Sequence, residues 1–134
     1  MKAEVKWIED LKFVGKTDKN QEIIFGGGDS TIVSPMEMVL IAAGGCSAID
    51  VVSILRKGRH QVTDCEVKLT SERREEAPRL FTDINLHFIV SGKELTDKIV
   101  ERAVQLSAEK YCSVSLMLGK AANITHSFEI KDAD

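Results

Sequence analysis

Thiol groups give this sequence its clearest chemistry. Cys46 lies in the apolar stretch 36–50, and Cys112 lies in a second helix-forming stretch far along the chain. Two thiols on separate helices suggest a redox pair. A zinc site would usually show close Cys and His spacing, and a secreted disulfide framework would usually show more cysteines in an even number. The pair therefore favours redox chemistry of thiols.

The third cysteine and one acid need separate interpretations. Cys65 alternates with charged residues on the apolar side of a predicted strand, which favours packing over chemistry. Asp50 follows Cys46 by one helical turn in an apolar helix, where a carboxylate needs a partner or a raised pKa. Two interpretations of Asp50 stay open, a satisfied structural acid and a site residue.

The histidines indicate no metal centre. His126 shares the apolar face of the last predicted strand, so we expect a hydrogen-bonded core histidine. His60 and His87 are predicted to be exposed. Because the three histidines are scattered, they form no metal-binding motif, and we expect neither a metal nor a cofactor.

Composition and charge narrow the class of protein. The 134 residues fit one domain over 1–134. A net charge of −3, with one Trp and one Tyr, makes nucleic acid an unfavourable partner. The N-terminus lacks the pattern of a signal peptide, and three cysteines fit a reducing, cytoplasmic compartment. The uncharged run 38–49 is short for a bilayer span, so we expect a core helix and no membrane partner.

Periodicity predicts an α+β fold. Alternation predicts three N-terminal strands over 2–8, 11–14 and 21–25, and the glycine run 26–30 is interpreted as a flexible linker. Further strands are predicted over 62–71, 84–90 and 123–131, with helices over 95–106 and 112–120.

The central helix is predicted over 34–57. Ser34 at the N-cap, Pro35 at the first helical position and Glu37 three residues after Ser34 form a capping box. The helix is apolar nearly all round, so we expect it to be buried on most faces. Gly44 and Gly45 disfavour a helix, which suggests a close backbone approach there.

Two of these stretches resemble a known family. The helix 34–48 resembles the Asn/Ser-Pro, Glu, Ala-Ala and Cys pattern of the OsmC/Ohr superfamily, and 111–115 resembles its second motif, usually Cys-Pro-Val-Ser. The order of elements also resembles that family over essentially the whole chain, within its YhfA-like branch. The resemblance implies an OsmC-like fold and an intertwined homodimer with two sites at the interface.

The resemblance also implies an activity. Its best-known members are cysteine-based peroxidases that reduce organic hydroperoxides and hydrogen peroxide in the oxidative stress response. It implies that Cys46 is the peroxidatic cysteine and Cys112 the resolving one, with an external dithiol as reductant. Glu37 and Asp50 are candidate supporting residues.

The sequence departs from the peroxidatic pattern in two places. Those relatives carry an arginine in the segment before the cysteine helix, held by a glutamate directly after the motif proline. Segment 21–32 has no arginine, and Met36 follows Pro35. Without a nearby cation, Cys46 is expected to titrate at or above about 8.5 and to react slowly at neutral pH. An alternative function is a non-catalytic module that binds a small lipophilic or sulfur ligand at the dimer interface. A third hypothesis, a purely structural protein, would leave both cysteine motifs unexplained.

Overall fold

The computed structural model describes residues 1–28 and 31–132. Its contacts divide the chain into two compact units, Met1–Ile41 and Ala42–Asp134, so the single domain over 1–134 stays a prediction. The interpretation of 26–30 as a linker falls partly outside the described residues, because 29 and 30 are not among them.

The first unit contains an antiparallel meander, as predicted. Strands β1 (Ala3–Glu9), β2 (Lys12–Thr17) and β3 (Glu22–Gly26) pair in the order β1-β2-β3. Phe13 lies opposite Phe25, and their rings stack with centroids 6.0 Å apart. All of β1 is exposed, including Val5 and Trp7. The half-buried face expected of β1 is therefore absent in the single chain.

Helix α1 (Pro35–Lys57) begins and ends where the sequence predicts. The Ser34 backbone N–H donates to Glu37 Oε1 at 3.0 Å, and the Glu37 N–H donates to Ser34 Oγ at 3.2 Å. This reciprocal pair is the predicted capping box.

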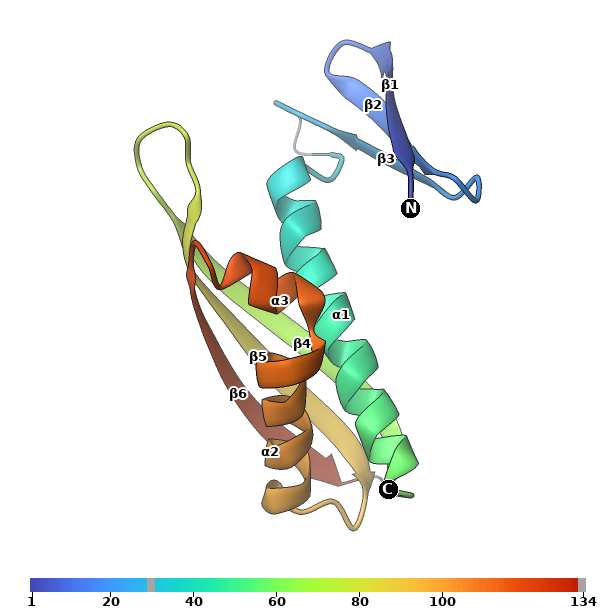
Figure 1. The fold of residues 1–134 in the computed structure, drawn as a ribbon, viewed down its shortest axis with the longest axis vertical. Coiled ribbons are helices and arrows are strands. Elements are labelled where there is room, and N and C mark those ends of the chain that lie inside the picture. The colour runs from blue at the N-terminus through green and yellow to red at the C-terminus, as the bar shows by residue number, and fades with distance from the viewer. Residues whose placement is uncertain (29–30, 133–134) are drawn as a thin grey trace. The chain divides into compact units, whose positions relative to one another are not determined.

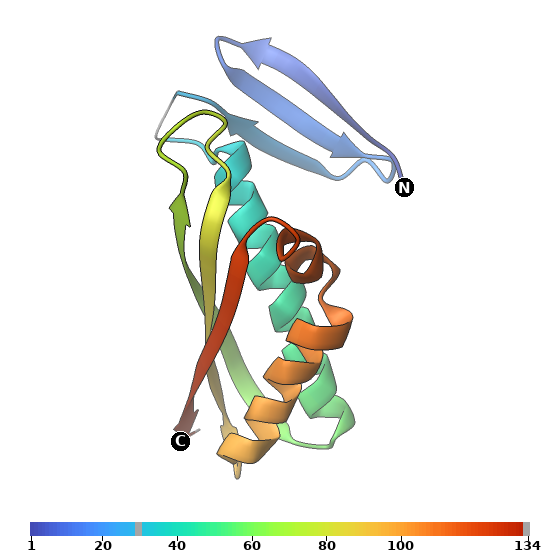
Figure 2. The ribbon, with the colours of Figure 1, turned by 60° about the vertical axis from the view of Figure 1, so that its left-hand side comes forward.

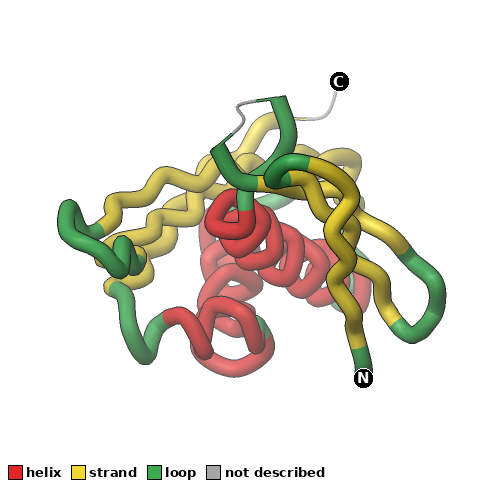
Figure 3. The backbone as a smooth tube through the Cα atoms, turned by 90° about the horizontal axis from the view of Figure 1, so that it is seen from above, coloured by secondary structure: helices red, strands yellow, loops and turns green. Residues whose placement is uncertain are grey.

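The second unit is built on a mixed sheet. Strand β4 (Gln61–Arg73) pairs antiparallel with β5 (Phe81–Lys93), and β6 (Asn123–Asp132) pairs parallel with β5. A parallel partner needs a crossover, and α2 (Asp97–Leu106), the π-helical turn η1 (Ser107–Tyr111) and α3 (Ser113–Leu118) form it. The helices lie on one face of this sheet (Figures 1 and 2). Figure 3 shows the backbone from above, with helices in red and strands in yellow.

The core lies between that sheet and the helices. Leu86, Phe88 and Val90 alternate along β5 toward the helices, and they are fully buried, as are Val51 of α1 and Val100 of α2. The two-layer α+β fold predicted from the sequence is thus confirmed, although η1 and the parallel direction of β6 were not predicted.

Helix α1 packs on one side only, which corrects the expectation that it is buried on most faces. Its buried residues include Ala43, Ser47 and Val51, whereas Ile41 and Ile49 are 64% and 71% exposed. The helix is long and apolar enough to cross a membrane by composition, but the core helix of a water-soluble protein passes the same test. One sheet can cover only one side of a helix, so the other side stays open in the single chain.

The close approach expected at the two glycines occurs at one of them. A Cβ at Gly44 would lie 2.7 Å from Leu69 Cδ1, whereas a Cβ at Gly45 would meet nothing within 4 Å. Gly44 therefore lets β4 pack close to α1, and packing within the chain does not account for Gly45.

Candidate active site

The structure brings Cys46, Asp50 and Cys112 together within the second unit. A sulfur or oxygen atom from each of the three side chains lies within 4.8 Å of the other two. Cys46 and Asp50 face the same way because they are one turn apart on α1. Cys112 joins them as the N-cap residue of α3, between η1 and α3 in the crossover.

Cys112 is fully buried in a shell of hydrogen bonds. Its sulfur accepts from the Ser47 hydroxyl at 3.2 Å and from the Ser115 backbone N–H at 3.4 Å, and its thiol can donate to Ser115 Oγ at 3.2 Å. Burial by itself raises the pKa of this thiol, but the hydrogen bonds of Ser115 and Ser47, aided by Cys46, outweigh it and leave the pKa below its ordinary value. Cys112 is therefore the thiol better able to carry negative charge.

Cys46 is only half-buried, and its acidity shifts the other way. Burial raises its pKa most; the Val114 backbone N–H partly opposes this, while Cys112 and the Asp50 charge raise it further. Cys112 is thus the more acidic thiol of the pair, and Cys46 the less acidic one.

Asp50 is held by a serine from the crossover. The Ser107 hydroxyl donates to Asp50 Oδ2 at 2.9 Å, and Ser107 is fully buried in η1. This bond fixes one carboxylate oxygen beside the thiols. Asp50 is therefore hydrogen-bonded and lies beside the two thiols, and its role as a site residue stays a prediction.

Three serines of this site were missed from the sequence: Ser47, Ser107 and Ser115. Ser115 carried a usable signal, because a residue three positions after an N-cap commonly bonds the cap side chain. Ser47 directly follows Cys46 in the sequence, but its hydroxyl donates to Cys112. Ser107 lies in a π-helical turn that the sequence did not predict. No local pattern pairs either of them with its partner.

The remaining predicted residues lie elsewhere. Glu37 is used in the capping box, where hydrogen bonds from Ser34 lower its pKa. Cys65 is half-buried on β4 and lines an apolar groove of about 660 Å³ together with Ile49 and Val52. Burial, followed by the charge of Asp64, raises the pKa of the Cys65 thiol.

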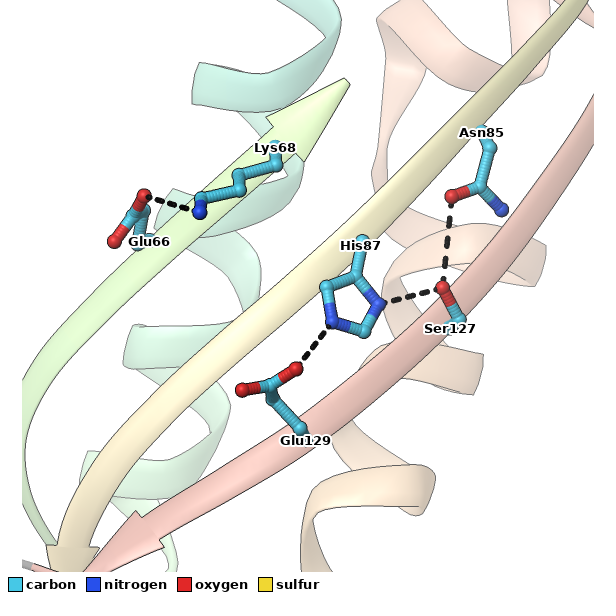
Figure 4. A network of polar contacts seen from close by, with 6 residues as sticks. All are labelled: Glu66, Lys68, Asn85, His87, Ser127 and Glu129. Carbon is cyan, nitrogen blue, oxygen red and sulfur yellow. Dashed lines mark hydrogen bonds and ion pairs between the residues drawn. The ribbon is translucent and has the colours of Figure 1, made fainter. Parts of the chain in front are cut away.

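A second polar cluster lies on the sheet face opposite the helices (Figure 4). His87 Nδ1 contacts Ser127 Oγ at 2.7 Å, and His87 Nε2 contacts Glu129 Oε2 at 2.8 Å. The bond to His87 is the main cause that lowers the pKa of Glu129. His87 is thus half-buried and paired, not exposed as predicted. His87 on β5 bonds residues of the neighbouring strand β6, so we interpret the cluster as cross-strand pairing.

His126 also differs from its prediction. Its ring stacks on Phe88 with centroids 6.2 Å apart, and within the described residues its buried Nε2 has no hydrogen-bond partner. Burial lowers the pKa of His126. The residue is half-buried against Phe88 of the core, and it lacks the expected hydrogen bond. His60 is half-buried instead of exposed.

The chain matches a known protein family over most of its length. The family model described as OsmC-like protein matches residues 26–127. The chain belongs to the OsmC-like family. Protein YhfA of Escherichia coli K12 is 69% identical to this OsmC-like chain over 132 residues, which cover 97% of the chain and 98% of YhfA.

Solved structures extend the comparison. A hypothetical protein from Aquifex aeolicus shares 34% identity with this OsmC-like chain at a TM-score of 0.90, over 99% of this chain and 97% of that one. An organic hydroperoxide resistance protein OsmC from Legionella pneumophila shares 13% identity at a TM-score of 0.72, over 95% of this chain and 94% of that one. At 13% identity, the latter likeness concerns the fold alone.

Proposed function

We propose that this OsmC-like protein is a thiol peroxidase that reduces hydroperoxides through Cys46 and Cys112. The observation that carries the proposal is the pair itself: one half-exposed thiol lies beside one buried, hydrogen-bonded thiol, with sulfurs no more than 4.8 Å apart. The half-exposed Cys46 can meet a substrate, and the buried Cys112 is placed to resolve the product.

The proposed cycle balances with one hydroperoxide and one dithiol. The Cys46 thiolate attacks one peroxide oxygen, the O–O bond breaks, and the leaving alkoxide takes a proton and departs as an alcohol. Cys46 is then a sulfenic acid. The Cys112 thiolate attacks that sulfur, hydroxide leaves and takes a proton from solvent to become water, and a Cys46–Cys112 disulfide forms. An external dithiol reduces the disulfide by exchange and leaves as its own disulfide.

The acidity of the two thiols sets the expected rate. Cys46 must lose its proton before it attacks, and burial together with the neighbouring Cys112 and Asp50 raises its pKa. Turnover should therefore be slow at neutral pH and should rise with pH until Cys46 is ionised. The absence of an arginine from segment 21–32 agrees with this expectation.

The test is turnover of cumene hydroperoxide with a dithiol reductant. Wild type and C65S should turn over, C46S should be inactive, and C112S should form the sulfenic acid without the disulfide. Peptide mapping after mild oxidation should find Cys46 joined to Cys112 and Cys65 reduced. A Cys46 that stays reduced under excess hydroperoxide would contradict the proposal.

We further propose that the protein acts as a homodimer in the cytoplasm. The uncovered side of α1, with Ile41 and Ile49, and the exposed Val5 and Trp7 of β1 are large apolar side chains open to solvent. A second copy would cover them, and a reducing compartment suits a thiol cycle.

A ligand-binding role is the second candidate, favoured by the groove beside Cys65. Ile49, Val52 and Ala48 give it apolar walls, and Arg56 and Lys57 add positive charge. A fatty acid would match both features. If this role is correct, a bound fatty acid should slow alkylation of Cys65, and the C46S variant should bind the fatty acid as wild type does.

A further inference from the structure

We propose that Cys46, Asp50 and Cys112 form a binding site for a thiophilic divalent cation, with Zn²⁺ as its natural occupant. The site uses the same thiols as the proposed peroxidase but does not depend on turnover. It would exist in the reduced protein only, because a disulfide removes both sulfur ligands.

The donor set suits zinc. Two thiolates and one carboxylate are common Zn²⁺ ligands, and three protein ligands leave a fourth position for water or another donor. Cys46 and Asp50 are both partly exposed, so the cation has a path from solvent. Two thiolates and a carboxylate together carry three negative charges. A divalent cation neutralises more of this charge than a single proton between the two thiols would.

The distances require little movement. In a tetrahedral site with Zn–S bonds of about 2.3 Å, two sulfur ligands lie roughly 3.8 Å apart. The three donor atoms already lie within 4.8 Å of one another. Cys46 and Asp50 come from consecutive turns of one helix, the spacing at which paired helical ligands hold zinc. Closure by about 1 Å or less for each pair therefore needs only side-chain adjustment.

The surrounding hydrogen bonds are compatible with metal binding. Ser107 holds Asp50 Oδ2, which leaves Oδ1 for a cation, and a donor on the second oxygen is a usual outer-shell partner of a ligating carboxylate. Ser47 and the Ser115 N–H donate to Cys112, which stabilises the thiolate that a metal requires. Binding displaces the Cys46 proton and any proton left on Cys112, and no electron transfer is involved.

The sequence hides this site because its ligands come from two distant segments of the second unit. Cys46 and Asp50 have zinc-like spacing, but Cys112 follows only after β4, β5, α2 and η1. No histidine takes part, so a search for Cys and His clusters does not find it.

The experiment titrates fully reduced, metal-free protein with Zn²⁺ against a chromogenic chelator. Titration with Cd²⁺ gives a second signal, since thiolate bound to Cd²⁺ absorbs in the ultraviolet. We expect one ion per chain in wild type and in C65S, the matched control. C46S, C112S and D50N should lose most of the affinity, and S107A should weaken it by about 10-fold, as other outer-shell changes do.

Several outcomes would overturn the site. The first is that the reduced wild type binds no Zn²⁺. The second is that D50N and C112S bind Zn²⁺ as tightly as wild type, and the third is that C65S loses the ion. Circular dichroism of each variant separates lost ligands from lost folding, and D50N removes charge with little change in shape. Turnover of cumene hydroperoxide by the metal-free protein is measured separately. An inactive protein that binds Zn²⁺ through these residues refutes only the peroxidase, and an active protein that fails to bind refutes only the metal site.

Discussion

At the scale of the residue, the two thiols differ because their hydrogen-bond partners differ. Both are wholly or partly buried, and burial raises the pKa of each. Cys112 overcomes this through two serines, whereas Cys46 has one backbone donor and two neighbours that can be negatively charged. The difference in acidity between the two thiols therefore resides largely in Ser47 and Ser115.

Removing either serine hydroxyl should make Cys112 less acidic. In a C46S/C65S background, S47A and S115A should each raise the pKa of Cys112, because each removes a bond that favours the thiolate. The measurement is thiolate ultraviolet absorbance against pH. S113A, at an exposed position in the same helix, is the matched control and should leave the curve unchanged. Identical titrations for all four proteins would contradict the assignment.

At the scale of the element, α1 has a packed side and an open side. The neighbouring glycines Gly44 and Gly45 lie on these different sides, since only Gly44 has a close neighbour in Leu69. Gly44 therefore lies in a packed environment and Gly45 in an open one, a difference that the sequence Gly44-Gly45 does not reveal.

Alanine at the two glycines should separate these environments. Within the single chain, G45A gains helix propensity of about 1 kcal/mol without meeting another atom. G44A gains the same propensity but forces Leu69 aside, and overpacking typically costs about 1–3 kcal/mol. We expect G44A to be less stable than G45A by at least about 1 kcal/mol in urea denaturation at one protein concentration. Equal urea midpoints for G44A and G45A would show that Leu69 of β4 moves aside without a cost in stability.

His126 should make the protein less stable in mild acid. Its pKa in the folded state is lowered by burial, whereas the unfolded chain has the ordinary value of about 6.5. As the pH falls through 6.5, the unfolded state takes up a proton that the folded state resists, so stability falls and levels off below the folded pKa. H126F should keep the stacking on Phe88 and remove this loss. Unchanged pH dependence of the urea midpoint would refute it.

The elements also show what sequence can predict. The capping box at Ser34 and the alternation along β5 are local, and both were predicted at the right residues. The direction of β6, the bond from Ser107 to Asp50 and the missing partner of His126 depend on the crossover, which brings distant segments together. The resemblance paired Cys46 with Cys112, but only the structure revealed the serines that make them unequal.

At the scale of the whole molecule, the open apolar side of α1 favours a second copy. Gly45 lies on that side next to Ala42 and between Ile41 and Ile49. Small residues let two helices approach closely, and their apolar neighbours lose contact with water.

A large charged side chain on this side should prevent dimer formation. G45R should convert a dimer to a monomer, measured by light scattering at micromolar concentration. G27R is the control, because Gly27 also has nothing within 4 Å of an added Cβ but lies outside α1. A wild-type monomer would refute the dimer, and a G45R dimer would place the interface elsewhere.

The crossover between β5 and β6 also determines at which stage of synthesis and folding Cys46 and Cys112 come together. Cys46 leaves the ribosome well before Cys112, and contacts between residues far apart in sequence form late in folding. Until α2, η1 and α3 have packed, Cys46 has no thiol beside it. In the proposed cycle, a sulfenic acid formed then cannot be resolved and proceeds to sulfinic acid, which is irreversible for most proteins. The proposed cycle therefore predicts that newly synthesised chains are the form most easily lost to oxidants, and that completed folding makes the oxidation of Cys46 reversible.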